Sequence, residues 1–428
     1  MADGPASTVA DLLDHLARQI LTDNDRGGYT VPSSRLYPFQ WNWDSAFVAL
    51  GWAEIDPARA WQEVERLLAA QWPSGMIPHI VFWSEEASYF PGPDFWRGNR
   101  GPVPSSGISQ PPVVATVVRH LLETGPTPDA RALHAVVDAI DRWHRWWYTA
   151  RGHGDGVIAV AHPWESGRDN LPDWDQPLEA VDSTSVGPYE RRDLDVVDAT
   201  MRPHKHDYDR YLALVEFGAE RNWEDSAISG VNPFWVADPA VTAILIRAEG
   251  DLAWLMQRRG GDGSEVANRV QRLVDGYESL WNPDAGAYCS RDLHTGLMAS
   301  AATSASFLAP YAGITTHLDD ICTTIDTWSH VCPYMVPSFD PGHPHFEPSR
   351  YWRGPVWLMV NYMIATGLAE AGRGEMADRI RRSSRDLIAS SGFPESFNPA
   401  TGGPVGGPHF AWTAALWLSW ARHAGGQP

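Results

Sequence analysis

The chain is poor in cysteine and in basic residues, and it contains no long apolar run. Its three cysteines, Cys289, Cys322 and Cys332, match neither a disulfide framework nor a zinc site, so we expect reduced thiols. With 33 basic and 53 acidic side chains, the net charge of -20 disfavours nucleic acid and anionic membranes as partners. No apolar run approaches the roughly 20 residues of a membrane span, and the N-terminus lacks a secretory signal. We therefore expect a cytoplasmic protein, with homo-oligomer formation left open.

Strand signals are also scarce, although short candidates such as 157–160 and 287–289 could form small hairpins in loops. Asp-Pro pairs at 56–57 and 238–239 have the pattern of helix starts, with a capping residue before a proline. Apolar residues recur at helical spacing in 6–23, 44–53, 57–71, 110–124, 128–150, 206–222, 238–259, 264–281, 315–328, 354–371, 374–390 and 409–424. This pattern predicts an all-α protein of paired helices, and a closed toroid of helical hairpins fits the length.

We predict a single domain over 1–428, because no sequence repeat at a fixed period indicates a solenoid. Three long irregular segments interrupt the helical pattern, at 73–107, 161–205 and 329–353. Loops of this size inside a compact domain usually have a function. We expect the three segments to lie on one face, as the walls and lid of a pocket.

Signatures of a bound cofactor are missing. The histidine pairs at 204–206 and 343–345 lack the spacing of a zinc motif such as HExxH, so surface histidines are the simpler interpretation. No Gly-rich phosphate loop follows a strand, and no Gly-x-Ser-x-Gly elbow indicates a serine hydrolase. We therefore expect no metal and no cofactor.

Tryptophan, in contrast, is abundant, with 22 residues, many of them in polar segments rich in glycine and proline. Flat aromatic faces suit the C–H surface of a sugar ring, while carboxylates and amides bind its hydroxyls. Two such aromatic segments, 162–170 and 393–399, each contain a candidate carboxylate, Asp169 and Glu395. Splitting a glycosidic bond needs two carboxyl groups with different pKa values, which this pair could supply.

Alternatives exist for each of these carboxylates. Trp164 could desolvate Asp169 and keep it protonated, but Asp169 could also cap a turn, and Glu395 could be an exposed loop residue. Three other acidic residues compete with Asp169 for the role of acid, namely Glu165, Asp173 and Asp175.

Two further segments combine aromatic rings with a charge. Asp44, in the segment 37–45, could accept hydrogen bonds from two adjacent sugar hydroxyls or could cap the helix that follows. Arg353, in the segment 351–357, is better explained as a partner in a buried ion pair.

Four motifs together resemble those of glycoside hydrolase family 63. They are Trp-Asn-Trp-Asp at 41–44, Trp-Glu-Ser-Gly-Arg-Asp-Asn at 164–170, Tyr-Trp-Arg-Gly-Pro-Val-Trp at 351–357 and Glu-Ser-Phe-Asn-Pro at 395–399. The chain is similar to the compact bacterial members, the mannosylglycerate and glucosylglycerate hydrolases. The resemblance implies an (α/α)6 barrel and an inverting mechanism, in which the two carboxyl groups lie about 6.5–9.5 Å apart.

The resemblance also assigns roles to residues. Asp169 matches the general acid and Glu395 the general base. The positions that match the sugar subsite are Trp41, Trp43, Asp44, Trp164, Gly167, Arg168, Trp352 and Trp357, with His409 and Trp412 on the far wall. The positions that match or could join the glycerate subsite are Arg202, Tyr208, Tyr37, Tyr89, Gln110 and Tyr351.

These implications lead us to expect an inverting hydrolase that releases glucose from glucosylglycerate, a small-molecule substrate. Mannosylglycerate or a neutral α-glucoside such as trehalose are the alternatives of the same chemistry. The orientation of Arg202 distinguishes a charged aglycone from a neutral one. A guanidinium that faces the pocket favours a charged aglycone, and one that faces solvent favours a neutral aglycone. Arg202 could instead form an ion pair with Asp207 or Asp209 at a helix start. Other classes are a carbohydrate-binding protein without catalysis, and an epimerase or lyase that uses His204 and His206.

Overall fold

The computed structural model describes residues 9–86 and 89–423. Each of the twelve stretches with helical spacing contains a helix, so this prediction is confirmed. The helices are α1 (Val9–Asn24), α2 (Asn42–Ala53), α3 (Pro57–Leu68), α5 (Val114–Thr124), α6 (Ala130–Trp146), α8 (Lys205–Glu220), α10 (Pro239–Arg258), α11 (Ser264–Glu278), α12 (Leu318–Val331), α13 (Leu358–Glu370), α14 (Gly374–Ser391) and α15 (Ala411–Leu416). α6 and α15 each continue into a π-helical turn, η1 (Trp147–Arg151) and η8 (Trp417–Ala421).

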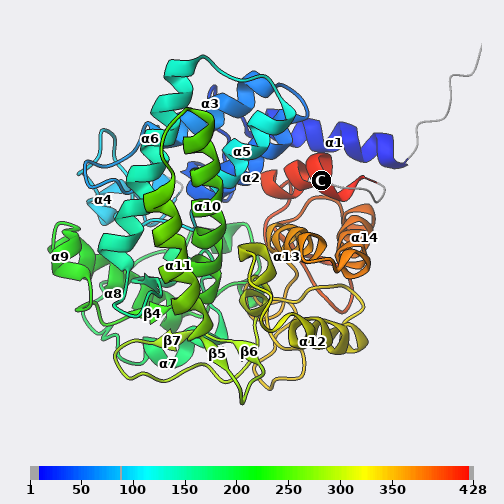
Figure 1. Ribbon diagram of the computed structural model, residues 1–428. Helices are drawn as coiled ribbons and strands as arrows, with labels where there is room; N and C mark the ends of the chain where they lie inside the picture. The colour runs from blue at the N-terminus through cyan, green and yellow to red at the C-terminus, as the bar shows by residue number, and fades with distance from the viewer. Residues whose placement is uncertain (1–8, 87–88, 424–428) are drawn as a thin grey trace, which may run out of the picture.

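The helices form two concentric rings, which confirms the predicted (α/α)6 barrel. The inner ring runs through α2, α5, α10, the 3-10 turn η7 (Pro310–Ala312), α13 and α15, and α15 contacts α2 again. Helices α1, α3, α6, α11 and α14 pack against the outside of this ring. α12 covers a second short turn, η6 (Ser304–Phe307), through a contact between the rings of Trp328 and Phe307 at 4.9 Å. Figure 1 shows α10 and α11 side by side, and α13 beside α14.

Burial follows from the position of a helix in the two rings. Every residue of α2 from Asn42 to Trp52 is buried, because neighbouring elements surround the helix. The outer helices α3 and α6 bury an apolar stripe and expose most of their polar residues, as amphipathic helices do. Arg59 and Glu63 of α3 are also buried and form an ion pair at 2.8 Å. The predicted starts are confirmed: Asp56 accepts hydrogen bonds from the backbone of α3, and Asp238 accepts one from the backbone of α10.

The barrel closes where the two ends of the described chain meet. α1 packs against α15, and Figure 1 shows the first helix beside the last. Trp417 Nε1 donates to Asp14 Oδ1 at 2.7 Å, and Arg422 Nη1 lies 2.5 Å from Asp14 Oδ2. These contacts join residues that are about 400 positions apart, so the ring depends on tertiary packing of its ends.

The strands are short and lie in the loops. Both predicted candidates are confirmed as strands, since β3 lies within 157–160 and β6 within 287–289. The antiparallel pairs are β1 (Gln40–Trp41) with β2 (Ile80–Val81), β4 (Val236–Ala237) with both β3 (Ala159–Val160) and β7 (Arg291–Asp292), β5 (Trp281–Asn282) with β6 (Ala287–Tyr288), and β8 (Ser396–Phe397) with β9 (Pro404–Val405). The pairs β1–β2 and β8–β9 fix the backbone beside two of the predicted motifs.

Apart from β2 and the residues that they share with the ends of α8 and α12, the described parts of the three irregular segments contain only single turns of helix. These turns are α4 (Pro93–Trp96), η2 (Pro163–Ser166), η3 (Pro172–Trp174), α7 (Asp175–Leu178), η4 (Asp193–Asp195) and η5 (Ala199–Met201). A further short helix, α9 (Asp225–Ile228), follows α8 outside these segments. The three cysteines are free thiols. Among residues 9–86 and 89–423, none of the helices is long and apolar enough to cross a membrane.

Candidate active site

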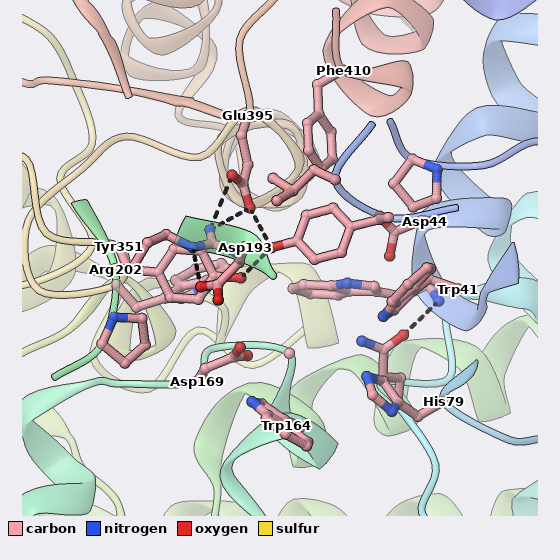
Figure 2. A pocket seen from close by; sticks show the side chains of 18 of the residues that line it. Trp41, Asp44, His79, Trp164, Asp169, Asp193, Arg202, Tyr351, Glu395 and Phe410 are labelled. Carbon is pink, nitrogen blue, oxygen red and sulfur yellow. Dashed lines mark hydrogen bonds and ion pairs between the residues drawn. The ribbon is translucent and has the colours of Figure 1, made fainter. Parts of the chain in front are cut away.

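Residues from all three irregular segments line one pocket, with about 780 Å³ of open space. Most of the predicted site residues line it: Tyr37, Trp41, Trp43, Asp44, Tyr89, Gln110, Trp164, Gly167, Asp169, Arg202, Tyr208, Tyr351, Trp352, Trp357, Glu395 and Trp412. Figure 2 shows the pocket with Glu395 and Asp169 on different walls and Arg202 beside Glu395.

Two predicted residues lie outside this lining. Arg168 is buried, forms an ion pair with Asp238 and lies over the ring of Trp174 at 5.7 Å. It therefore ties the second irregular segment to the start of α10 and does not face the sugar. His409 lines a separate surface hollow beside α1. The resemblance placed Arg168 in the sugar subsite, but the side chains of Arg168 and Asp169 point apart in the turn, and only Asp169 lines the pocket.

Asp169 follows a tight turn that presents it to the pocket. The turn η2 ends at Gly167, which has a positive φ of 70°, and a Cβ atom there would lie 2.6 Å from the ring of Trp43. Only glycine meets both conditions. Burial raises the pKa of Asp169 to about 7, and the negative charge of Glu395 adds to this, against the lowering effect of Arg202. The carboxyl group can therefore carry a proton near neutral pH and donate it.

The competing carboxylates of the same segment all have partners outside the pocket. Glu165 pairs with Arg151 at 2.8 Å, and Asp175 pairs with Arg353 at 2.8 Å. Asp173 accepts a hydrogen bond from a serine hydroxyl, and burial raises its pKa to about 6. A raised pKa alone therefore does not identify the acid, since only Asp169 among these four lines the pocket.

Glu395 precedes β8 and lies on a rigid backbone. Its N–H donates to Gly407 O at 2.8 Å, and Trp412 Nε1 donates to its carbonyl oxygen at 3.1 Å. The carboxylate is 1% exposed and accepts hydrogen bonds from Tyr37 Oη and the N–H of Gly407. It is not the exposed loop residue that the sequence left as an alternative.

Arg202 faces the pocket and not the solvent. Its Nη1 lies 3.2 Å from Glu395 Oε2, and its Nε lies 3.2 Å from Asp193 Oδ2. The guanidinium is also 4.4 Å from the ring centre of Tyr351. The predicted alternative, an ion pair with Asp207 or Asp209 at the start of α8, is wrong, because Arg202 has its partners across the pocket.

Asp44 does not cap a helix. It sits in the first turn of α2, where Trp41 is the N-terminal capping residue and no side chain caps the turn. Asp44 is 4% exposed and lines the pocket. Burial raises its pKa well above the usual range, and the charges of Glu395 and Asp169 act in the same direction. A buried carboxyl group directed into a pocket is suited to hydrogen bonds with sugar hydroxyls.

Aromatic rings form much of the remaining wall. Trp352 and Trp357 stack with ring centres 4.0 Å apart, and Trp43 lies 6.2 Å from Trp352. Trp164 and Tyr208 approach each other edge to face at 5.8 Å on another part of the wall. Flat apolar faces beside buried carboxyl groups match the two surfaces of a sugar ring.

Sequence reasoning missed several lining residues, among them His79, Phe90, Arg191, Asp193 and Phe410. Asp193 and Arg191 lie in a run of charges that is typical of a solvated loop, so no local signal marked them. The pair at 204–206 is not part of the lining, and no group of three or more potential ligands in the described residues could hold a metal ion. The prediction of Arg353 as an ion-pair partner is confirmed.

Comparison with known proteins identifies the family of the chain. The family model described as "Mannosylglycerate hydrolase MGH1-like glycoside hydrolase domain" matches residues 37–413. Mannosylglycerate hydrolase MGH2 of Selaginella moellendorffii is 44% identical over 410 residues, 94% of this chain and 84% of the relative. Mannosylglycerate hydrolase of Thermus thermophilus is 44% identical over 95% of this chain and all of the relative. Glucosylglycerate hydrolase of Mycolicibacterium hassiacum is 33% identical over 98% of this chain and all of the relative.

Solved structures show the same relationship. The GH63 mannosylglycerate hydrolase of Thermus thermophilus, in complex with Tris and D-glycerate, superposes with a TM-score of 0.92 at 43% identity, covering 95% of this chain and 99% of that one. Neutral trehalase Nth1 of Saccharomyces cerevisiae shares the fold, with a TM-score of 0.58 at 16% identity over 91% of this chain and 72% of that one. The chain therefore belongs to the MGH1-like enzymes of glycoside hydrolase family 63 and is a glycosidase.

Proposed function

We propose that this enzyme hydrolyses an α-linked hexosyl glycerate with inversion of the anomeric configuration, and that mannosylglycerate is its preferred substrate. The observation that carries the proposal is a buried arginine, Arg202, on the wall of a pocket that also holds the two carboxyl groups. A cation in that place suits an aglycone that carries a carboxylate. This orientation favours the charged aglycone over a neutral α-glucoside.

The choice of sugar rests on the relatives. The sequence motifs favoured glucosylglycerate, but two proteins named mannosylglycerate hydrolase are 44% identical to this chain, against 33% for one named glucosylglycerate hydrolase. We therefore place mannose before glucose. The two sugars differ in the orientation of one hydroxyl group, so the same catalytic residues serve both.

The proposed mechanism assigns one step to each carboxyl group. Asp169, with its pKa near 7, donates its proton to the glycosidic oxygen as the bond to the anomeric carbon breaks. Glu395 takes a proton from a water molecule, whose oxygen attacks the anomeric carbon from the opposite face. Asp44 and the tryptophans hold the sugar ring. The products are the free hexose with inverted anomeric configuration and glycerate.

Release of the hexose from a panel of glycosides tests the proposal. The panel contains mannosylglycerate, glucosylglycerate, trehalose and maltose, and proton NMR of the fresh product reports the anomer. We expect fast turnover of mannosylglycerate, slower turnover of glucosylglycerate, and a β-anomer as the first product. Turnover of trehalose or maltose at the same rate would contradict the charged aglycone, and an α-anomer would contradict the role of Glu395.

A further inference from the structure

The general base has no free position for the water that it must activate. An ionised carboxylate offers about four acceptor sites, two on each oxygen. Oε1 of Glu395 accepts from Tyr37 Oη at 3.1 Å and from Arg202 Nη1 at 3.3 Å. Oε2 accepts from the N–H of Gly407 at 3.0 Å and from the same Arg202 nitrogen at 3.2 Å. A water molecule can bind Glu395 only if one of these donors leaves.

Arg202 is the donor that a substrate can draw away. The N–H of Gly407 belongs to a backbone that pairs with Glu395 in both directions, so it stays in place. Tyr37 Oη is uncharged and lies within 3.2 Å of the hydroxyl of Tyr351. Arg202 alone among the three is a cation, and an incoming carboxylate attracts it directly.

Asp193 gives the guanidinium a fixed point about which to move. Its Oδ2 lies 3.2 Å from Arg202 Nε, whereas Glu395 contacts Nη1, and Asp193 is itself held by Arg191. Figure 2 shows Asp193 and Glu395 both directed at Arg202. A small rotation about the Nε contact would take Nη1 away from Glu395 and Nη2 away from Tyr37 Oη while the arginine stays paired with Asp193. Glu395 would keep its hydrogen bonds from Tyr37 Oη and from the N–H of Gly407.

We propose that Arg202 inhibits the general base until the carboxylate of the substrate's aglycone draws it from Glu395, with Asp193 as the pivot. This inference rests on the proposed function and adds a cause for its specificity. A glycoside with a neutral aglycone binds but leaves Arg202 on Glu395, so the attacking water has no base. The charge of the aglycone then acts on the rate of the chemical step and not only on binding.

A substrate without an aglycone distinguishes an effect of the glycerate charge on the rate of the chemical step from an effect on substrate binding. In α-mannosyl fluoride the water oxygen bonds to the anomeric carbon, fluoride leaves with the bonding electron pair, and the proton goes to Glu395. We expect D-glycerate, added as a separate molecule, to raise the kcat of the wild-type enzyme about tenfold or more, because it occupies the aglycone site and takes Arg202. D-glyceramide, which has the same shape without the charge, should have no such effect.

Two variants make the test specific to Arg202. Arg202→Met should hydrolyse α-mannosyl fluoride faster than wild type in the absence of D-glycerate, and should not respond to D-glycerate. Arg353→Met removes a cation whose ion pairs are with Asp175 and Glu347, outside the pocket, and it should keep the response. Thermal unfolding measurements check that each variant is folded. If Arg202→Met does not fold, the response of the wild-type enzyme to D-glycerate and D-glyceramide tests the inference without it.

The outcomes separate this inference from the proposed function. If wild type cleaves mannosylglycerate but D-glycerate only inhibits the hydrolysis of the fluoride, Arg202 merely binds the aglycone and the inference is overturned. If wild type does not cleave mannosylglycerate or glucosylglycerate, the proposed function fails first. Activation by D-glycerate, and its loss in Arg202→Met alone, would establish the coupling.

Discussion

Asp169 and Asp193 are the same residue type, lie in the same irregular segment and line the same pocket, yet their pKa values shift in opposite directions. Burial is the largest influence on both and raises both. For Asp193, hydrogen bonds and charges from Arg191 and Arg202 outweigh burial and lower the pKa below its usual value. For Asp169, the carboxylate of Glu395 adds to burial, and the pKa rises to about 7.

The difference shows that cations, and not burial, decide which carboxyl group can act as an acid here. At Asp169 the charge of Arg202 opposes burial without outweighing it, no cation among the described residues acts on Asp44, and both pKa values rise. The side with Asp193 is held together by ion pairs. A general acid needs the first environment, whereas an anchor for an arginine needs the second.

Exchanging each aspartate for asparagine should give the largest contrast. Asp169→Asn removes the proton that the leaving oxygen needs, so kcat for mannosylglycerate should fall about 10²–10⁴-fold. Asp193→Asn keeps that proton, and its effect should appear mainly as a higher KM through a displaced Arg202. Steady-state kinetics at pH 6.5 measures both, and equal losses of kcat would remove the distinction between the two residues.

The pH dependence of activity should report the acid. Because the role proposed for Asp169 requires its protonated form, kcat/KM should decrease above a pH of about 7, its pKa, by about tenfold per unit. Arg202 lowers this pKa, so the decrease should begin at a higher pH in Arg202→Met. If kcat/KM decreases at the same pH in Arg202→Met as in wild type, the decrease reports the ionisation of another group and not of Asp169.

The pH dependence of stability should have opposite signs for the two aspartates. The folded pKa of Asp193 is lowered from 3.8, so its contribution is present above that pH and is lost as pH falls through the folded value. Asp193→Asn should therefore cost about 1–3 kcal/mol of unfolding free energy at pH 7 and less in acid. The pKa of Asp169 is raised, so its contribution is lost as pH rises from 3.8 to about 7.

Urea unfolding of the two variants between pH 4 and pH 8 measures this contrast. Relative to wild type, Asp169→Asn should gain stability as the pH rises, whereas Asp193→Asn should lose it. Parallel curves for the two variants would show that the ion pairs of Asp193 do not outweigh its burial.

A third aspartate of the same segment should show the smallest effect. Asp175 pairs with Arg353 outside the pocket, and its side chain is 42% exposed. Because such a pair is screened by solvent, Asp175→Asn should change the unfolding free energy by less than about 1 kcal/mol and leave kcat unchanged. A loss of kcat comparable to that of Asp169→Asn would mean that the acid had been assigned to the wrong residue of the segment.

The helices were predictable because their signal is local. Apolar spacing and the Asp-Pro starts depend on neighbours three or four positions apart, and the helices formed where expected. The predictions of where helices begin and end were less accurate. The helix expected over 354–371 begins at Leu358, since Gly354 approaches the backbone of Glu347 closely and Pro355 cannot donate a hydrogen bond.

The sequence by itself determined the helices, the aromatic segments and the two carboxyl groups of the pocket, because periodicity and motifs are properties of short segments. Tertiary structure decided what each charge does. Arg202 and Glu395 are 193 positions apart, and Arg168 turned from the pocket to pair with Asp238, 70 positions away. The pKa of a buried carboxyl group depends on the charges around it in space, and only the closed barrel brings those charges together.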